Sequence, residues 1–218
     1  MNDVPLPRII FSLLVFTVMF FTGCSESEPA LDSVKGYVVF DYKDESQNPS
    51  VRLAVFAQVS SEVRRAENIR IKNVSTGFEW NCINPSVFSD DKNQWVGYAD
   101  FLSPDGIDLP IGIYNFAYTD SQEKEVNLSF SLNYDSDLIK ANAEKSISLL
   151  GENPKEKYAI YSEANVLLYY GEKKQNWIND EKIFSTDVKY SYYRKIYTDR
   201  YDGVVCIMPP VYKNTKNN

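Results

Sequence analysis

The amino-acid sequence predicts an all-β fold, and two observations carry that prediction. Aromatic residues make up 14% of the 218 residues, led by sixteen Tyr, and aromatic and β-branched side chains favour strands over helices. From residue 34 to about residue 134, short runs rich in Val, Ile, Phe and Tyr alternate with clusters of Asn, Asp, Pro, Gly and Ser. This is the pattern of short strands joined by turns. The chain is also long enough to bury a sizeable core, so one large domain is expected.

Seven strands are expected between residues 34 and 134. Their ranges are 34–42, 51–60, 69–74, 78–82, 95–101, 112–119 and 125–133. In the last range apolar and polar residues alternate from Val126 to Asn133, which predicts one buried and one solvent-exposed face. Gly77 ends the segment NVSTG and supplies the positive φ that a tight hairpin requires. Pro104 in SPDG (103–106) predicts a second turn.

The stretch from Leu109 to Tyr114 (LPIGIY) resembles the approach to the penultimate strand of immunoglobulin-like and fibronectin type III-like domains. The resemblance implies a tyrosine corner, in which the Tyr114 hydroxyl bonds an upstream backbone group. With the seven strands, it implies an immunoglobulin-like antiparallel β-sandwich over residues 34–134. The paired cysteines of antibody domains are absent, since Phe116 stands where the second is expected.

Residues 135–212 are expected to form a smaller β-rich C-terminal extension packed on the sandwich, with a second compact domain as the alternative. A short helix or a bent connection is expected within 136–150, and a loop over 151–157. Strands are expected over 164–170, 188–197 and 204–208, the last two flanking a turn at 199–203. The tail, 213–218, is expected to be disordered.

The N-terminus has the layout of a secretory signal. Residues 1–8 carry Arg8, and residues 9–22 form a charge-free, mostly apolar run that ends at Gly23 and Cys24. This run is shorter than the roughly 20 residues that a transmembrane helix needs. A cleaved signal, residues 1–23, is therefore expected in place of a permanent span, followed by a polar, acidic tether over residues 24–33.

The residues FTGC (21–24) resemble the lipobox of bacterial lipoproteins, although Phe21 stands where Leu is usual. The resemblance implies cleavage between Gly23 and Cys24, a diacylglycerol thioether on Cys24 and acylation, for example with palmitate, of the new amino group. The protein would then be anchored by lipid to a membrane of the bacterial cell envelope, on its periplasmic or cell-surface side. An ordinary cleaved signal or an uncleaved anchor is the alternative.

Composition excludes several functions. The net charge of −7 argues against a nucleic-acid partner. The absence of His removes Ser-His-Asp and Cys-His catalysis and His-based zinc sites. The acidic groups around Asp41 and at Asp90 and Asp91 lack EF-hand spacing and are interpreted as loop charge. No catalytic, cofactor or metal site is predicted.

Two other groups of residues are candidates for a structural or binding role. An exported location would permit a disulfide between Cys82 and Cys206, with two separate buried thiols as the alternative. Tyr190, Tyr192 and Tyr193 are the expected ligand-facing aromatics, because neighbours on a strand point to opposite faces. Most other large aromatic residues are expected in the core.

These observations favour a non-enzymatic binding or envelope-structural module with a protein or glycan ligand. The alternative is a carboxylate-dependent glycan-processing enzyme or its accessory subunit. Such an enzyme needs two carboxylates in a cleft, roughly 5 to 10 Å apart.

Overall fold

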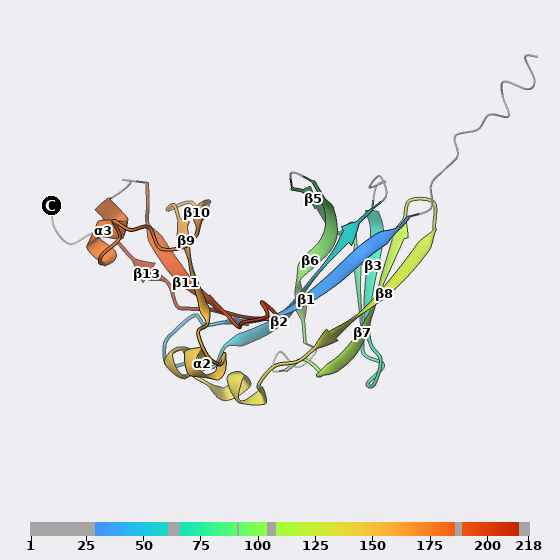
Figure 1. The fold of residues 1–218 in the computed structure, drawn as a ribbon, viewed down its shortest axis with the longest axis horizontal. Helices are drawn as coiled ribbons and strands as arrows, with labels where there is room; N and C mark the ends of the chain where they lie inside the picture. Colours follow the sequence, from blue (N-terminus) through green and yellow to red (C-terminus); the bar gives the residue numbers. More distant parts are fainter. Residues whose placement is uncertain (1–28, 61–65, 91, 104–107, 186–188, 214–218) are drawn as a thin grey trace, which may run out of the picture.

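The computed structural model describes residues 29–60, 66–90, 92–103, 108–185 and 189–213, and there the chain is an all-β protein (Figure 1). The strands of the first part are β1 (Leu31–Asp41), β2 (Ser50–Val59), β3 (Ala66–Asn73), β4 (Glu79–Ile83), β5 (Ser86–Ser89), β6 (Gln94–Leu102), β7 (Gly112–Asp120) and β8 (Glu125–Leu132). Those of the second part are β9 (Lys155–Tyr161), β10 (Leu167–Gly171), β11 (Tyr192–Thr198), β12 (Val204–Ile207) and β13 (Val211–Tyr212). All seven strands expected between residues 34 and 134 are present.

The first eight strands form a sandwich. In the large sheet, four neighbouring strands follow the order β1-β2-β6-β5, and the small sheet follows β4-β3-β7-β8. Lettered along the chain as A, B, C, C′, D, E, F and G, these orders read A-B-E-D and C′-C-F-G. This is the strand order of an immunoglobulin-like sandwich. The predicted fold class is confirmed; the short strand β5, all of whose residues are exposed, was not predicted.

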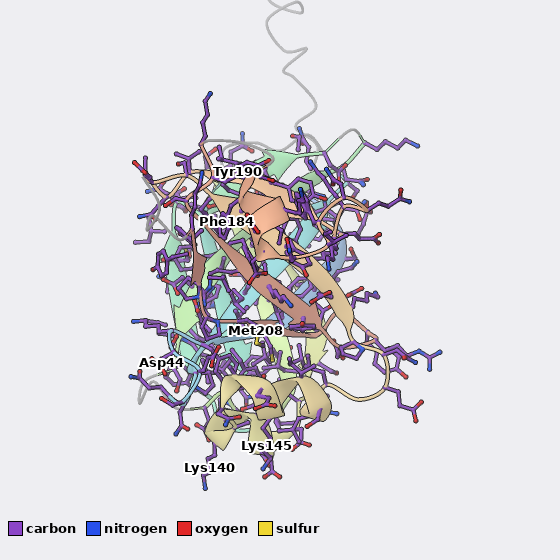
Figure 2. All side chains as sticks on the ribbon, turned by 90° about the vertical axis from the view of Figure 1, so that its left-hand side faces the viewer. Asp44, Lys140, Lys145, Phe184, Tyr190 and Met208 are labelled. Atoms are coloured by element: carbon purple, nitrogen blue, oxygen red, sulfur yellow. The ribbon has the colours of Figure 1, made fainter. Side chains whose placement is uncertain are left out.

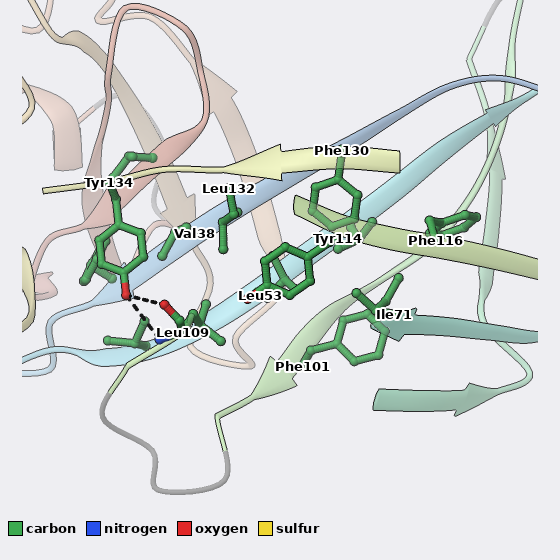
Figure 3. Packing of buried hydrophobic residues seen from close by; sticks show 14 of the residues in the cluster. Val38, Leu53, Ile71, Phe101, Leu109, Tyr114, Phe116, Phe130, Leu132 and Tyr134 are labelled. Carbon is green, nitrogen blue, oxygen red and sulfur yellow. Dashed lines mark hydrogen bonds between the residues drawn. The ribbon is translucent and has the colours of Figure 1, made fainter. Parts of the chain in front are cut away.

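The main core lies between the two sheets (Figure 3). Val38 and Leu53 of the large sheet and Ile71 and Phe116 of the small sheet are fully buried in it. Tyr114 belongs to the same core, and its ring stacks on that of Phe130 with a centroid distance of 5.4 Å. Burial of these large side chains is the main favourable contribution to folding of the sandwich.

Two tyrosine hydroxyls hold the chain where it enters β7. Tyr114 donates to the carbonyl oxygen of Pro110 at 2.5 Å, so the predicted tyrosine corner is confirmed. Tyr134 donates to the carbonyl oxygen of Leu109 at 2.7 Å and accepts from its N–H at 3.2 Å (Figure 3). The backbone of two consecutive residues is thereby satisfied inside the core by side chains from β7 and from the segment after β8.

The hairpin at Asn73 also follows the expectation. Gly77 has φ +72°, which a side chain would disfavour. The Asn73 side-chain oxygen accepts from the backbone N–H groups of Ser75 and Thr76. The turn is therefore specified by an Asx motif as well as by glycine.

The C-terminal strands extend the large sheet, and they do not form a layer packed on the sandwich. β12 runs parallel to β1, with Val38 paired to Val204 and Asp41 to Ile207. β11 then pairs antiparallel with β12, β9 with β11 and β10 with β9, while β13 lies beside β11. One sheet of nine strands thus joins both parts of the chain. Figure 1 shows its orange and red strands reaching beyond the small sheet on the left.

A second, smaller core stabilises this extension. Helix α3 (Asp180–Ser185) covers one face of β9 and β11, and Trp177 is fully buried beside it. The cluster consists of Tyr158, Ile160, Trp177, Ile183, Phe184, Tyr190 and Tyr193. Figure 2 shows Phe184 and Tyr190 at this end, with Met208 between them and the short helices that carry Lys140 and Lys145.

The short helix expected within residues 136–150 is present as two short helices, and two other expectations for the second part need correction. The range 136–150 contains a 3-10 helix, η1 (Ser136–Lys140), and a separate helix α2 (Ala143–Leu149), because the Asn142 side chain accepts from the Lys145 N–H and starts a new helix. The expected loop over 151–157 is wrong at its end, since β9 begins at Lys155. The strand expected over 164–170 starts later, because Asn165 takes φ +58° in the preceding turn.

Candidate functional site

A groove of about 1160 Å³ lies on the large sheet. It lies where the sandwich and the extension meet. Its borders are β8, the turn from β11 to β12, and side chains of β5 and β10 at the two ends of the large sheet. Figure 1 shows β5 and β10 rising on the same side of β1, so the sheet is curved around this region. The groove is lined by Val34, Lys35, Gly36, Tyr37, Phe56, Phe88, Ser129, Phe130, Ser131, Leu132, Asn133, Lys157, Tyr170, Thr198, Asp199, Tyr201, Asp202, Gly203 and Val205.

One edge of β1 borders the groove without a neighbouring strand. β2 pairs with β1 along its whole length, but β12 pairs with it only from Val38 to Asp41. Among the described strands, none lies beside residues 31–37 on that edge. The Val38 N–H donates to the Gly203 carbonyl oxygen at 2.9 Å, so it points away from β2. Since alternate residues of an antiparallel strand point to the same edge, the N–H and C=O groups of Val34 and Gly36 face the groove.

Phe130 limits the space above this edge. A Cβ atom built on Gly36 would lie 2.3 Å from Cε2 of the Phe130 ring. β8 can therefore approach β1 only because residue 36 is glycine. The outward side chains of β8, Ser129 and Ser131, line the groove and are exposed.

Aromatic side chains form two of the walls. Phe56 and Phe88 meet edge to face with centroids 5.5 Å apart, and Phe88 also stacks on Trp95 at 6.4 Å. On the opposite wall, the Lys157 ammonium lies 5.2 Å from the centre of the Tyr170 ring. Exposed aromatic surface next to hydroxyl and amide groups is typical of binding sites for peptides and glycans.

The turn from β11 to β12 forms a rigid rim. Asp202 has φ +58° and accepts from Lys155 Nζ at 2.6 Å and from the Thr198 hydroxyl at 3.0 Å. The hydrogen bond from Lys155 is the main cause that lowers the pKa of the Asp202 carboxyl. Burial, with the nearby charge of Asp202, raises the pKa of Tyr37. Asp202 is thus ionised and ion-paired at neutral pH, and it is unsuited to act as a general acid.

The aromatic residues chosen from the sequence do not form this site. Tyr190 and Tyr193 are buried, so their expected exposure is wrong. Tyr192 is half-buried, stacks on Tyr161 at 4.8 Å, and donates to the Asn165 side chain. Tyr192 and Tyr193 do point to opposite faces, but α3 and Trp177 cover the face of Tyr193.

A second depression of about 600 Å³ lies on the other face of β11, beside α2. There the Tyr193 hydroxyl donates to the Asp180 carboxylate, and the Tyr197 hydroxyl donates to Glu156 at 2.6 Å. Burial and these carboxylates raise the pKa of both tyrosines. Glu156 also pairs with Lys195 at 3.4 Å. Each of these two carboxylates is therefore engaged by a tyrosine.

The disulfide considered between Cys82 and Cys206 is not formed, and both residues are free thiols. Cys82 lies on β4 of the small sheet, whereas Cys206 is buried in β12 of the large sheet. Burial raises the pKa of the Cys206 thiol to about 12. Both cysteines therefore act as small apolar residues, as in the alternative interpretation.

The acidic groups have structural partners. Asp41 accepts from Arg52 and Arg194, and Asp44 and Asp90 accept from backbone N–H groups of their own turns. In the described ranges, no three or more acidic or thiol side chains are placed to hold a metal ion. Asp91, residues 104–106 of the SPDG turn and the tail from residue 214 lie outside the described residues.

The signal sequence, Gly23 and Cys24 also lie outside the described residues. Within the part that the structure describes, no helix has the length and apolar character needed to cross a bilayer. Comparison with models of protein families finds no match for the chain, and comparison with curated proteins finds none either.

The groove was not predicted from the sequence. Tyr37 and Phe56 were assigned to strands, but nothing local indicates that the edge beside Tyr37 stays open. That property depends on the length of β12, which lies more than 160 residues away along the chain. Tyr170 was among the large aromatic residues expected mostly in the core, and it is exposed.

Proposed function

We propose that this protein is a lipid-anchored binding protein of the bacterial cell envelope, which takes a protein or glycan ligand in the groove beside β1. It performs no catalysis. The open groove is the observation that carries the binding role. An open backbone edge and solvent-exposed aromatic walls are costly to leave uncovered, and such surfaces commonly mark interaction sites.

The anchor rests on the N-terminal pattern, in which an apolar run ends at Gly23 and Cys24. Each buried methylene of an acyl chain contributes about 0.8 kcal/mol to membrane binding, and two or more chains give stable residence. β1 begins only seven residues after Cys24. An anchored chain would therefore hold the start of β1, and with it the groove, close to the membrane surface.

Absence of catalysis is proposed from the state of the carboxylates. Two aspartates line the groove: Asp202 is paired with Lys155, and Asp199 accepts from the Val204 N–H. The second depression is lined by Glu45, Glu144 and Asp180, of which Asp180 accepts from the Tyr193 hydroxyl. A carboxylate-dependent hydrolase needs one carboxyl group with a raised pKa to donate a proton, whereas the pKa of the Asp202 carboxyl is lowered.

The anchor is tested by labelling cells with radioactive palmitate. The unmodified protein is expected to incorporate label and to partition into detergent, whereas Cys24→Ser should do neither. Cys82→Ser is the matched control and should behave like the unmodified protein. Equal labelling of the unmodified chain and Cys24→Ser would overturn the anchor.

The groove is tested separately, with Tyr170→Ala and Phe88→Ala compared with Tyr98→Ala outside it. Each protein is immobilised and exposed to solubilised envelope proteins and to oligosaccharides released from the same envelope. A ligand that occupies the groove should be retained by Tyr98→Ala and lost by both groove variants. A ligand retained equally by all three would place binding elsewhere.

A further inference from the structure

We infer that the ligand of the groove is an extended peptide segment of a partner protein, which binds as an additional strand along the open edge of β1. This inference rests on the proposed function and narrows it to one class of ligand. It rests on the open backbone edge at residues 31–37. Side chains lie on both sides of this edge, and the side chains of an added strand could contact them.

The backbone pattern is the first step of the argument. Val34 and Gly36 direct their N–H and C=O groups into the groove. On this edge β12 begins at Val204, which lies opposite Val38. In a strand these groups repeat every second residue, about 6.6 Å apart. A peptide backbone presents donors and acceptors at the same repeat, whereas the hydroxyls of a sugar chain do not follow it. Strand addition to an open edge is a recurring mode of peptide recognition.

The geometry of β12 is the second step. Because β12 already pairs with the other half of β1, an added strand would lie in line with it and continue the same sheet. The turn that contains Asp202 and Gly203 closes one end of the available edge. The open length of seven residues corresponds to about 23 Å of strand. A peptide of six or seven residues would therefore fill it.

The walls are the third step. Successive side chains of an added strand point to opposite faces. One set would meet the aromatic rings of Phe56 and Tyr170 on the open face of the sheet, and the other set would meet the hydroxyls of Ser129 and Ser131 on β8. The groove therefore fits a segment in which large apolar residues alternate with small polar ones.

The test uses the full chain, expressed in a bacterium and purified in mild detergent, and a phage-displayed library of random twelve-residue peptides. A selected peptide is synthesised, and hydrogen exchange is measured at single amides with and without it. We expect the Val34 and Gly36 amides to exchange at least about tenfold more slowly when the peptide is bound. The Lys35 and Tyr37 amides, which face β2, should be protected in both states. Peptide binding without added protection at Val34 and Gly36 would overturn the inference.

A protein variant tests the same contact. Val34→Pro removes the edge N–H but leaves the hydrogen bonds to β2, because the Val34 N–H points away from that strand. The peptide should bind about fivefold more weakly to Val34→Pro than to the matched control Val34→Thr. Equal binding would count against strand addition.

A modified ligand tests it without any change to the protein. Two versions of the selected peptide are made, one N-methylated at the odd positions and one at the even positions. Only one of them should lose binding, because only one set of peptide N–H groups faces β1. Loss of binding by neither version would overturn the inference.

If no peptide is selected but envelope oligosaccharides bind and depend on Tyr170, the groove remains a binding site and only the peptide inference fails. If neither class binds, both proposals fail.

Discussion

The guanidinium of Arg194 in β11 reaches across β12 to the carboxylate of Asp41 in β1, with 2.6 Å between Nη2 and Oδ1. The same guanidinium donates to the carbonyl oxygens of Tyr42 and Met208, each at 2.7 Å. Asp41 also pairs with Arg52 of β2 at 2.9 Å. This network joins the C-terminal strands to the sandwich. Its charged residues belong to the large sheet, on which the groove lies.

Loss of Arg194 should therefore destabilise the whole protein. Arg194→Ala would take from Asp41 one of its two guanidinium partners and from the carbonyl oxygen of Met208 its donor; the Asp41 side chain is only 18% exposed, and Met208 is buried. We expect the free energy of unfolding to fall by about 3 kcal/mol, measured by urea denaturation. Arg194→Lys retains the charge but not the planar fork, so it should recover only part of the loss. A loss below about 0.5 kcal/mol for Arg194→Ala would show that the network contributes little.

The same network predicts a pH dependence. Burial alone would raise the pKa of Asp41, but hydrogen bonds and charge from Arg194 and Arg52 outweigh it and lower the pKa. The stability contributed by Asp41 is therefore present above its unfolded pKa of about 3.9 and is lost as pH falls through the lower, folded pKa. The difference in unfolding free energy between wild type and Asp41→Asn should be largest near pH 7 and shrink below about pH 4. A difference that stays constant from pH 7 to pH 2 would contradict this account.

The tyrosine corner should be worth a measurable share of stability. Tyr114→Phe leaves the partly buried carbonyl oxygen of Pro110 without this donor and changes little else. We expect a loss of about 1 to 2 kcal/mol in unfolding free energy. Tyr98→Phe, at an exposed position, is the control and should lose less than about 0.5 kcal/mol. Similar values for the two variants would argue against a structural role for the Tyr114 hydroxyl.

Close packing of β8 on β1 predicts an intolerance at Gly36. The methyl group of Gly36→Ala would overlap the Phe130 ring, and we expect a cost of about 1 to 3 kcal/mol in unfolding free energy. Phe130→Leu should reduce that cost when combined with Gly36→Ala, because it removes the ring edge that the methyl group meets. Additive losses in the double variant, measured by urea denaturation, would mean that this contact is not the cause.

The two free thiols predict a distinct chemical behaviour. Cys206 is buried and its pKa is raised, so it should react with a thiol reagent only after unfolding. Cys82 is half-buried and should react slowly in the native protein. Mobility on non-reducing and reducing gels should be the same. Recovery of a joined Cys82–Cys206 peptide by mass spectrometry would contradict the structure.

Local pattern was sufficient to predict the sandwich. The alternation from Val126 to Asn133 describes β8 correctly, and the approach to Tyr114 correctly identifies the tyrosine corner. Both features depend on residues close together in the sequence, where periodicity and turn chemistry act directly. The same reasons explain the hairpin at Gly77.

Local pattern was insufficient where distant segments decide the outcome. Tyr193 was expected to be exposed, but α3 and Trp177 cover it, and neither was predicted to pack there. No strand was predicted at β9, and its first residues were assigned to a loop, although pairing with β11 holds them in the sheet. The groove depends on where β12 begins beside β1, at Val204 opposite Val38, which no short window of sequence contains.

The central claim, that a ligand occupies the groove beside β1, is tested most directly by photo-crosslinking in living cells. A photoreactive phenylalanine analogue replaces Lys35, at the groove, or Lys72, on the exposed face of the small sheet. The account predicts a discrete crosslinked product from position 35 and none from position 72. A product from position 72 alone, or the same product from both positions, would contradict it.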